Sequence, residues 1–367
     1  MNKKYKVIIA GGGTGGHIFP AVAIANALTK IMPEVRILFV GAKGRMEMQK
    51  VPEAGYKIIG LPVIGIQRKL SFKNFIVPFK LIKSLLIARI ILKRFKPNAV
   101  IGVGGYASAP VSYMASLLKI PVLLQEQNSF PGLTNKILAK KADRICVAYE
   151  GMEKYFPKEK ILVTGNPIRQ NIKNIGNKKN KAILEFGLNE TRKTLLVIGG
   201  SLGAYSINKA IHNSIEMLTA NNIQIIWQTG INYYETAQSS TKNIEKGSVV
   251  TTKFIKQMDL AYAASDIIVS RAGAITVSEL CLVKKPVILV PSPNVAEDHQ
   301  TKNAMILVNN GAAIIVKDNE TYEKLGKTII ELVKDEQKQL SLSNGIAKLA
   351  LPNADEIIAG EVIKLFK

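Results

Sequence analysis

Histidine and cysteine are scarce in this chain of 367 residues, which contains three of the first and two of the second. The cysteines, Cys146 and Cys281, both lie in apolar segments, RICVAY and ELCLV. Neither has a second cysteine or a histidine at a spacing typical of a structural zinc site. These absences argue against a zinc site or a disulfide framework and predict two reduced thiols in the core.

No segment has the roughly 20 mostly uncharged residues that a membrane-spanning helix needs. The best candidate, residues 71–96, is rich in Ile and Leu but is interrupted by Pro78, Lys80, Lys83 and Arg89. Two interpretations remain, an amphipathic helix on a membrane surface or a helix packed on a sheet with its basic edge in water. The apolar part of MNKKYKVIIAGGG is too short for a signal peptide and runs into a predicted strand, so we expect a cytoplasmic location.

Acidic residues are outnumbered, because 27 Asp and Glu face 50 Lys and Arg, which gives a formal net charge of +23. This excess favours an anionic partner such as nucleic acid, an anionic membrane or a phosphorylated substrate. Aromatic residues make up only 6% of the chain and are not interleaved with the basic ones, as stacking in a nucleic-acid groove would require. We therefore expect no nucleic-acid partner, and the charge favours a peripheral membrane contact at 71–96.

What the sequence does contain is a regular alternation of short apolar segments with helical ones. The apolar segments are 6–10, 36–41, 99–104, 122–126 and 161–165 in the first half, and 194–200, 223–228, 266–270, 286–291 and 312–316 in the second. Strands that alternate with helices predict parallel sheets, here built twice, and therefore an α/β fold with two Rossmann-like domains. We place these domains at 1–164 and 165–350, with a hinge near Gly165–Pro167 and a terminal helix at about 351–367 that can pack back onto the first domain.

Five of the six residues 11–16 are glycine, in the segment AGGGTGGHIFPA directly after the first predicted strand. Gly11, Gly13 and Gly16 fit the pattern G-x-G-x-x-G, in which missing side chains let a phosphate or a sugar approach backbone N–H groups at a helix start. The dinucleotide-binding form of this pattern also needs an acidic residue at the end of the second strand. That strand ends FVGAKG without an acid, which weakens the interpretation as an NAD(P)-dependent enzyme.

Two further glycine-rich loops, 101–110 and 198–204, also follow apolar segments. Together the three loops predict a cleft lined with backbone donors from both domains. The segment SRAGAITVSEL offers another helix start to a pyrophosphate, and its Glu279 can accept two hydrogen bonds from a ribose diol. The segment PSPNVAEDHQTKNA places His299 and Gln300 after the next strand, where open α/β sheets bind ligands.

Seven motifs in this order resemble those of the MurG-type glycosyltransferases: GGGTGGHIFPA, GVGGYASAP, QEQNSFPGLTNK, GNPIR, GGSLGA, RAGAITVSE and EDHQTKNA. The resemblance covers nearly the whole chain. This family transfers N-acetylglucosamine (GlcNAc) from UDP-GlcNAc to lipid I, the undecaprenyl-pyrophosphoryl-MurNAc-pentapeptide, and forms lipid II for peptidoglycan. The resemblance implies a glycosyltransferase-B fold, with two Rossmann-like domains facing a cleft. The donor is then bound mainly by 165–350, and the acceptor and the membrane by 1–164.

The resemblance also implies which residues bind each substrate. The implied donor contacts are Thr14, Gly15, Gly16, Asn128, Arg169, Ser201, Ile255, Ala274, Ile275, Thr276, Val277, Ser278, Glu279, His299 and Gln300. Within this set, Arg169 and Ser201 are expected at the phosphates and Glu279 at the ribose. The backbone of Ile255 is expected at the uracil, and Gln300 and His299 at the GlcNAc hydroxyls. The implied acceptor contacts are Gly13, Gly104, Gly105, Tyr106 and Asn135, and the implied membrane contacts are Phe75, Phe79, Lys80, Ile82, Lys83, Leu86, Arg89 and Lys140.

The implied reaction inverts the anomeric centre, so one group must take a proton from the attacking 4-hydroxyl of MurNAc. We expect His17 to be this base because imidazole titrates near neutral pH. The alternative is that His17 caps the helix or binds a substrate oxygen without moving a proton. Glu126 in QEQN is the second candidate base, and its own alternative is an ion pair with a lysine.

The departing UDP needs a compensating positive charge, and many sugar-nucleotide enzymes supply it with a metal held by an Asp-x-Asp motif. No such triplet occurs in this sequence. Arg169 and the helix N-termini near residues 201 and 273 can stabilise the leaving group instead, so we expect that no metal or other cofactor is required.

The family implies a peripheral protein on the cytoplasmic face of the inner membrane, with UDP-GlcNAc, lipid I and an anionic membrane surface as partners. It also implies a role in cell shape and division and contacts with other cell-wall synthesis and division proteins. The alternatives are another sugar-nucleotide-dependent transferase or an epimerase on the same fold, and an NAD(P)-dependent oxidoreductase.

Overall fold

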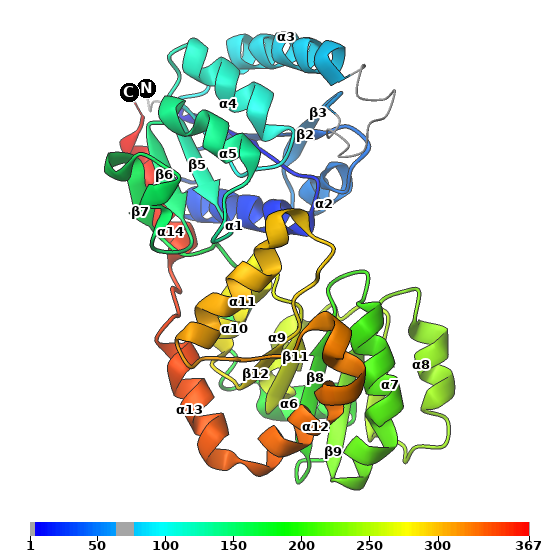
Figure 1. Ribbon diagram of the computed structural model, residues 1–367. Coiled ribbons are helices and arrows are strands. Elements are labelled where there is room, and N and C mark those ends of the chain that lie inside the picture. The colour runs from blue at the N-terminus through cyan, green and yellow to red at the C-terminus, as the bar shows by residue number, and fades with distance from the viewer. Residues whose placement is uncertain (1–3, 64–76, 367) are drawn as a thin grey trace. The chain divides into compact units, whose positions relative to one another are not determined.

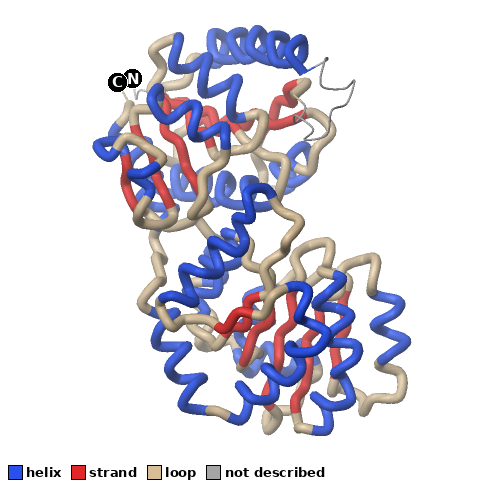
Figure 2. The backbone as a smooth tube through the Cα atoms, in the orientation of Figure 1, coloured by secondary structure: helices blue, strands red, loops and turns tan. Residues whose placement is uncertain are grey.

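The computed structural model of the protein describes residues 4–63 and 77–366 (Figure 1). The chain divides into two compact units, of which the first consists of Met1–Ile168 with Asn353–Lys367 and the second of Arg169–Pro352. Each unit contains one sheet of parallel strands with helices packed against it (Figure 2). The predicted α/β class with two Rossmann-like domains is confirmed.

The first unit is built on a seven-stranded sheet in the order β3-β2-β1-β4-β5-β6-β7. Its strands are β1 (Lys6–Ala10), β2 (Arg36–Ala42), β3 (Lys57–Leu61), β4 (Ala99–Gly102), β5 (Val122–Glu126), β6 (Arg144–Val147) and β7 (Ile161–Val163). Its helices are α1 (Gly15–Ile31), α2 (Glu47–Glu53), α3 (Val77–Phe95), α4 (Ser108–Leu117), α5 (Leu133–Leu138) and α14 (Ala354–Lys364). The strand order reverses between β1 and β4, so the loops after these two strands diverge at the carboxyl edge of the sheet. These are the first two glycine-rich loops.

Both faces of this sheet are buried, which explains why its strands are continuous apolar runs rather than alternating ones. Ile8 of β1 packs on one face with Leu92 of α3, and Ile9 packs on the other with Leu28 of α1. Ile358 of α14 joins the second of these clusters, so the last helix of the chain completes the core of the first unit.

The second unit is built on a six-stranded sheet in the order β10-β9-β8-β11-β12-β13. Its strands are β8 (Lys193–Ile198), β9 (Ile223–Gln228), β10 (Val249–Thr252), β11 (Ile267–Ser270), β12 (Val287–Leu289) and β13 (Ile314–Ile315). Its helices are α6 (Lys179–Phe186), α7 (Tyr205–Ala220), α8 (Tyr234–Ser240), α9 (Met258–Ala264), α10 (Ala274–Val283), α11 (His299–Asn309), α12 (Thr321–Lys334) and α13 (Glu336–Ala347). The order reverses between β8 and β11, so the loops 199–204 and 271–273 occupy the switch point of this sheet.

Candidate active site

The first two glycine-rich loops pack against each other because they lack side chains. A Cβ atom built on Gly11 would lie 2.3 Å from Cγ2 of Val103, and one built on Gly105 would lie 2.3 Å from the carbonyl oxygen of Gly12. Both separations are far shorter than van der Waals contact, and Gly105 also has a φ of +80°, which other residues rarely adopt. The loops after β1 and β4 therefore form one continuous surface at the switch point.

His17 lies in the first turn of α1, at the junction of these two loops. Its Nδ1 lies 3.1 Å from the carbonyl oxygen of Gly12 and 3.3 Å from Oγ1 of Thr14. A carbonyl oxygen can only accept a hydrogen bond, so a hydrogen bond to Gly12 requires the proton on Nδ1, which in a neutral ring leaves the lone pair on Nε2. The ring lies over the second loop, since a Cβ on Gly104 would come within 2.9 Å of Nε2.

Glu47 is a buried carboxylate beneath the first loop that the sequence analysis missed. Its side chain is 1% exposed, and it accepts hydrogen bonds from the backbone N–H groups of Ala42 at 2.9 Å and Gly13 at 3.0 Å. Glu47 lies three residues beyond FVGAKG, the end of the second predicted strand, where a dinucleotide-binding site carries its ribose-binding acid. Both of its oxygens bind backbone groups, so it does not serve as the ribose ligand of a dinucleotide site.

Glu126, the second candidate base, ends β5 and is buried. Its oxygens accept hydrogen bonds from the backbone N–H groups of Asn128 at 3.0 Å and Gly132 at 3.1 Å, and from the side-chain amides of Asn135 at 2.9 Å and Asn128 at 3.3 Å. Burial raises the pKa of this carboxyl group, and the hydrogen bonds oppose that shift. The arrangement folds the loop after β5 around the carboxylate.

Three buried amides link this loop to the end of β7. Nε2 of Gln127 donates to the carbonyl oxygen of Val103 at 2.8 Å and also to Oε1 of Gln125. Nε2 of Gln125 donates to Oδ1 of Asn166 at 3.0 Å, and Nδ2 of Asn166 donates to the carbonyl oxygen of Gln127 at 3.0 Å. The network ties the second glycine-rich loop to the GNPIR segment.

The predicted acceptor residues differ in how accessible they are. Tyr106 is 56% exposed and Gly13 is exposed, whereas Gly104 is buried and Gly105 partly buried. Asn135 is 2% exposed and binds Glu126, so its side chain supports the loop from below rather than facing solvent. Of the first-unit residues predicted to bind the donor, Thr14 and Gly16 are exposed and Gly15 and Asn128 are partly buried.

In the second unit, Arg169 and Glu279 form an ion pair. Nη2 of Arg169 lies 2.9 and 3.2 Å from the two carboxylate oxygens of Glu279, and Nε lies 3.1 Å from Oε1. Oη of Tyr262 donates to Oε2 at 3.1 Å. Burial raises the pKa of Glu279, which is 4% exposed, and the Arg169 guanidinium opposes that shift. The structure thus joins one predicted phosphate ligand with the predicted ribose ligand and adds Tyr262.

The third glycine-rich loop passes from β8 to α7 and presents Ser201 to solvent. Gln228, which the sequence analysis also missed, connects this loop to the predicted uracil site. Its Nε2 donates to the carbonyl oxygen of Gly200 at 2.9 Å, and its Oε1 accepts from the backbone N–H of Ile255 at 2.9 Å. Gln228 therefore fixes the spacing between the loop and the Ile255 backbone.

Helix α10 begins with small residues directly after Gly273, which has no side chain with which to cap the helix. Ala274 and Val277 are buried, while Ile275, Thr276 and Ser278 are partly buried. Ser278 donates to the carbonyl oxygen of Ala274 at 3.1 Å. The first N–H groups of α10 and the positive end of its dipole suit an anion.

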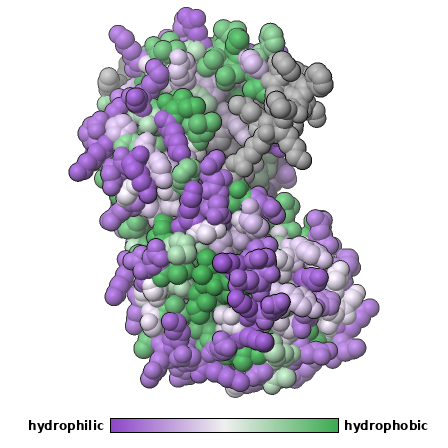
Figure 3. All heavy atoms as spheres, in the orientation of Figure 1, coloured by the Kyte–Doolittle hydropathy of each residue, from purple (hydrophilic) through white to green (hydrophobic). Residues whose placement is uncertain are grey.

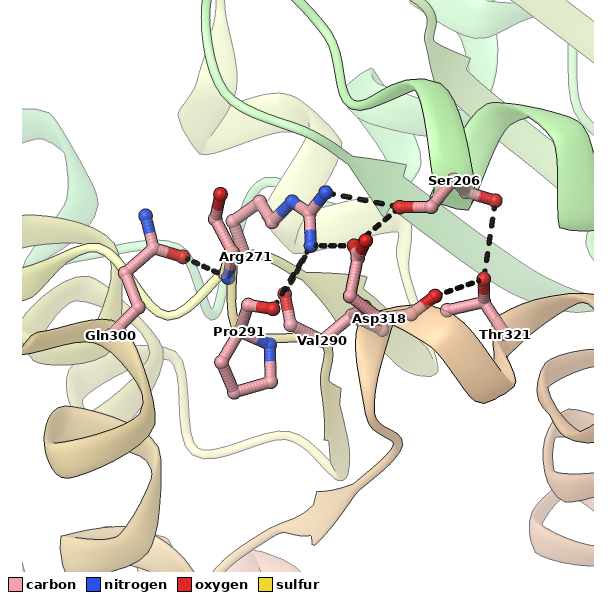
Figure 4. Close-up of polar contacts among 8 residues, drawn as sticks. Ser206, Arg271, Val290, Pro291, Gln300, Asp318 and Thr321 are labelled. Carbon is pink, nitrogen blue, oxygen red and sulfur yellow. Dashed lines mark hydrogen bonds and ion pairs between the residues drawn. The ribbon is translucent and has the colours of Figure 1, made fainter. Parts of the chain in front are cut away.

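The segment 291–300 runs from the end of β12 into the first turn of α11 and carries His299 and Gln300, both partly buried. Figure 4 shows Gln300. Oε1 of Gln300 accepts from the backbone N–H of Ser292 at 2.8 Å. Arg271 holds the start of the segment, because its Nη1 donates to the carbonyl oxygens of Val290 at 3.0 Å and Pro291 at 3.1 Å.

Arg271 is itself held by two side chains from other parts of the second unit. Its Nη1 lies 2.5 Å from Oδ1 of Asp318, and its Nη2 donates to Oγ of Ser206 at 3.0 Å (Figure 4). Ser206 belongs to the first turn of α7, so Arg271 connects that helix, Asp318 and the 291–300 segment.

Helix α3 covers the basic and apolar region predicted to touch a membrane. It packs inward through Ser84, Ala88, Ile91 and Leu92. Its outer side exposes Phe79, Ile82, Leu86 and Ile90 together with Lys83 and Arg89, and Lys80 is partly buried. Hydrophobic and hydrophilic residues alternate over this end of the unit (Figure 3). Lys140 is exposed after α5, and Phe75 lies outside the described residues.

Within 4–63 and 77–366, no helix is long and apolar enough to cross a membrane.

The described residues contain no group of three or more His, Cys, Asp or Glu side chains placed to hold a metal ion. Cys146 and Cys281 are buried, and burial raises the pKa of each thiol to about 12. Neither cysteine can therefore act as a thiolate near neutral pH.

Comparison with known proteins matches the chain to two domains of a single family. Residues 7–147 match the glycosyltransferase family 28 N-terminal domain, and residues 194–356 match the glycosyltransferase family 28 C-terminal domain. A protein of Bacteroides thetaiotaomicron is 54% identical over 367 residues, covering 100% of this chain and 99% of its own. One of Flavobacterium psychrophilum is 52% identical over 363 residues, covering 99% and 98%. Both are named UDP-N-acetylglucosamine--N-acetylmuramyl-(pentapeptide) pyrophosphoryl-undecaprenol N-acetylglucosamine transferase.

Solved structures agree with this result. The crystal structure of Acinetobacter baumannii MurG has a TM-score of 0.79 and 27% sequence identity, and the match covers 99% of this chain and 100% of that one. A UDP-GlcNAc 2-epimerase from Neisseria meningitidis has a TM-score of 0.68 at 16% identity, with coverage of 99% and 100%. At that identity the epimerase shares the fold alone.

Proposed function

The chain belongs to glycosyltransferase family 28 and, within it, to the MurG-type transferases, and from this membership we propose how its residues carry out the reaction. The chain transfers GlcNAc from UDP-GlcNAc to the MurNAc 4-hydroxyl of lipid I and forms lipid II. The acceptor oxygen forms a bond to C1 of GlcNAc while the bond from C1 to the UDP oxygen breaks, and the configuration at C1 inverts. The hydroxyl proton passes to a base of the enzyme.

His17 is this base. The hydrogen bond from Nδ1 to the Gly12 carbonyl leaves the lone pair on Nε2, at the surface where the two glycine-rich loops of the first unit meet. The 3.1 Å contact between Nδ1 and the Gly12 carbonyl oxygen is the observation that carries the mechanism. Glu126 is less suited to the role, because four hydrogen bonds already engage its two oxygens and hold the loop after β5.

Arg169 and Glu279 exchange partners when the donor binds. The ribose diol replaces the guanidinium at the Glu279 carboxylate, which keeps its hydrogen bond from Tyr262, and Arg169 turns to the phosphates. The exchange is supported by chemistry, since a hydroxyl pair offers the carboxylate two donors as the guanidinium does, and the pyrophosphate offers the guanidinium two acceptors.

The remaining donor contacts follow from the same unit. Ser201 and the first N–H groups of α10 bind the phosphates, and the backbone of Ile255, spaced by Gln228, binds the uracil. Gln300 and His299 bind the GlcNAc hydroxyls. The amide oxygen of Gln300 is engaged by Ser292, and its amide nitrogen points away from that contact and can donate to the sugar (Figure 4).

The departing UDP is stabilised without a metal ion. It develops charge next to Arg169 and the N-terminus of α10, and these fixed positive groups supply the compensation that a divalent cation supplies elsewhere. The acceptor pyrophosphate binds at Gly13, Gly104 and Gly105, with Tyr106 beside them. Helix α3 and Lys140 hold the first unit on the anionic, cytoplasmic surface of the membrane that contains lipid I.

The test is transfer of labelled GlcNAc from UDP-GlcNAc to a lipid I analogue, with and without EDTA. We expect lipid II with a β-1,4 linkage and the same rate in both conditions. A folded protein that yields no product would refute the transfer, and a rate lost in EDTA would refute the metal-free mechanism.

The variant His17→Ala tests the base. General-base catalysis contributes roughly 10²- to 10⁴-fold, so kcat should fall by about that factor while the KM for UDP-GlcNAc changes little. Turnover near that of the unchanged protein would assign His17 to helix capping instead.

A further inference from the structure

The Gly12–Gly13 peptide group lies between His17 and Glu47 and is hydrogen-bonded to both. Its carbonyl oxygen accepts from Nδ1 of His17 at 3.1 Å, and its N–H donates to Oε2 of Glu47 at 3.0 Å. The carbonyl and the N–H belong to one planar unit, so they cannot turn independently. Whatever fixes the N–H also fixes the direction of the carbonyl.

Glu47 holds this peptide from a buried position and also binds the end of β2. It is the first residue of α2, it is 1% exposed, and its other oxygen accepts from the backbone N–H of Ala42 at 2.9 Å. A Cβ on Gly12 would lie 2.3 Å from Oε1 of Glu47, so the glycine is needed for the carboxylate to reach the loop. The carboxylate thus approaches the loop from the side that faces the protein interior.

The loop would not keep this peptide orientation by itself. Gly12 and Gly13 have φ values of +143° and +90°, and glycine populates many other conformations at little cost. A charge-assisted hydrogen bond to a buried carboxylate is stronger than a neutral one, and it also polarises the peptide and makes the carbonyl a better acceptor.

We propose that Glu47 is a positioning residue that acts on His17 through the Gly12–Gly13 peptide, holding the proton on Nδ1 and presenting the Nε2 lone pair to the acceptor hydroxyl. This inference rests on the proposed role of His17 as the base. Glu47 does for the imidazole what a directly bonded carboxylate does in other enzymes, with one peptide group in between.

The first experiment reads the tautomer of His17 directly. Because the chain has only three histidines, ¹⁵N labelling of histidine gives a simple spectrum, and His17→Ala assigns the His17 signals. We expect a protonated Nδ1 and an unprotonated Nε2 in the unchanged protein. In Glu47→Gln one of the two backbone N–H groups faces an NH₂ group, and we expect a mixture of tautomers.

The matched control is Asp143→Asn. Asp143 also accepts a hydrogen bond from a backbone N–H in the first unit, that of Val122 at 2.8 Å, but it lies before β6 and away from the glycine-rich loops. This variant should leave the His17 signals unchanged. A His17 tautomer that is identical in Glu47→Gln and in the unchanged protein would overturn the inference, whether or not the enzyme transfers GlcNAc.

The second experiment measures coupling in the transfer reaction. Glu47→Gln should lower kcat roughly 10- to 100-fold, less than the full contribution of a general base, with the KM for UDP-GlcNAc within about twofold. In a His17→Ala background the same substitution should change kcat by less than about twofold, because its target is gone. Equal losses in both backgrounds would show that Glu47 only stabilises the fold and would overturn the inference.

If Glu47→Gln does not fold, Glu47→Asp replaces it in both experiments. Aspartate keeps the charge but is one methylene shorter and reaches only one of the two N–H groups. Partial loss of the His17 tautomer and of kcat is expected, and a tautomer and kcat equal to those of the unchanged protein would overturn the inference.

Discussion

Arg169 and Glu279 lie 110 residues apart in the chain and form an ion pair with three N–O separations of 2.9, 3.1 and 3.2 Å. The two partners are unequally buried, since the side chain of Glu279 is 5% exposed and that of Arg169 is 34% exposed. Loss of Arg169 and loss of Glu279 therefore have different consequences. The carboxylate without the guanidinium is a buried, uncompensated charge, whereas the guanidinium without the carboxylate can be hydrated.

The first prediction concerns stability. Arg169→Ala should lower the free energy of unfolding of the second unit by about 3 kcal/mol, and Glu279→Gln by about 1 kcal/mol. Trp227 is the only tryptophan of the chain and is fully buried in the second unit, so its fluorescence during urea denaturation reports on this unit. Equal losses in the two variants would contradict the asymmetry.

The second prediction separates the two residues in donor binding. Glu279→Gln should weaken binding of both UDP and uridine by roughly tenfold, because the ribose is common to them. Arg169→Lys should weaken UDP but leave uridine within about twofold, because it alters only the phosphate contact. Isothermal titration with the two ligands measures this, and a uridine affinity that falls equally in both variants would refute the exchange of partners.

The third prediction concerns the segment that carries His299 and Gln300. Arg271→Ala removes the group that holds Val290 and Pro291, so kcat/KM for UDP-GlcNAc should fall at least tenfold while the dissociation constant of UDP changes little. Asp318→Asn should have a smaller effect in the same direction. Arg192→Ala is the control, since it removes another ion pair of this unit, with Glu245 at 2.7 Å, directly before β8. If Arg271→Ala and Arg192→Ala were equally active, Arg271 would not be needed to position the segment that carries His299 and Gln300.

The fourth prediction follows from Lys285, whose Nζ donates to the carbonyl oxygens of Ala263 and Ser265. Burial lowers the pKa of Lys285 to about 8, from 10.5 in an exposed lysine. Between these two values the unfolded chain binds more protons at this position than the folded chain, so the free energy of unfolding should rise with pH from about 8 to 10.5. Urea denaturation followed by Trp227 fluorescence should show this rise and should show a smaller one in Lys285→Met. Identical pH profiles for the unchanged protein and Lys285→Met would contradict the lowered pKa of Lys285.

The fifth prediction tests the membrane surface. Replacing Lys80, Lys83 and Arg89 by Glu should release the protein from vesicles that contain anionic lipid, since each basic residue near such a surface contributes about 1 kcal/mol. The control replaces Lys327, Lys334 and Lys338 of the second unit by Glu, which changes the net charge by the same amount. Sedimentation with vesicles at physiological salt measures binding. Equal release of both triple variants would show that net charge alone, and not the surface of α3, controls binding.

The apolar segments predicted as strands correspond to β1, β2, β4, β5 and β7 in the first unit and β8, β9, β11, β12 and β13 in the second. They stand out because parallel strands buried on both faces need continuous apolar runs. The strands β3, β6 and β10 are not among the predicted segments. The edge strands β3 and β10 pair with only one neighbour each, and the apolar run of each is a pair of residues, Ile58 with Ile59 and Val249 with Val250.

The site was predictable where a motif is local. Glycines, His17, Glu126 and Glu279 stand in short motifs whose chemistry can be recognised one segment at a time. Glu47, Tyr262 and Gln228 were missed because each acts through a partner far away in the sequence, such as Gln228 with Ile255.

The sequence by itself determined that this chain folds as two parallel α/β units and belongs to a family of GlcNAc transferases, because hydrophobic periodicity and contiguous motifs are properties of neighbouring residues. Only the tertiary structure decided how the chemical groups are oriented. The Nδ1 of His17 points at the Gly12 carbonyl, the peptide behind it is held by Glu47, and Glu279 is neutralised by Arg169. The first relation depends on the conformation of the glycine-rich loop, and the other two depend on distances between segments that are far apart in the chain, so the sequence pattern alone does not encode them.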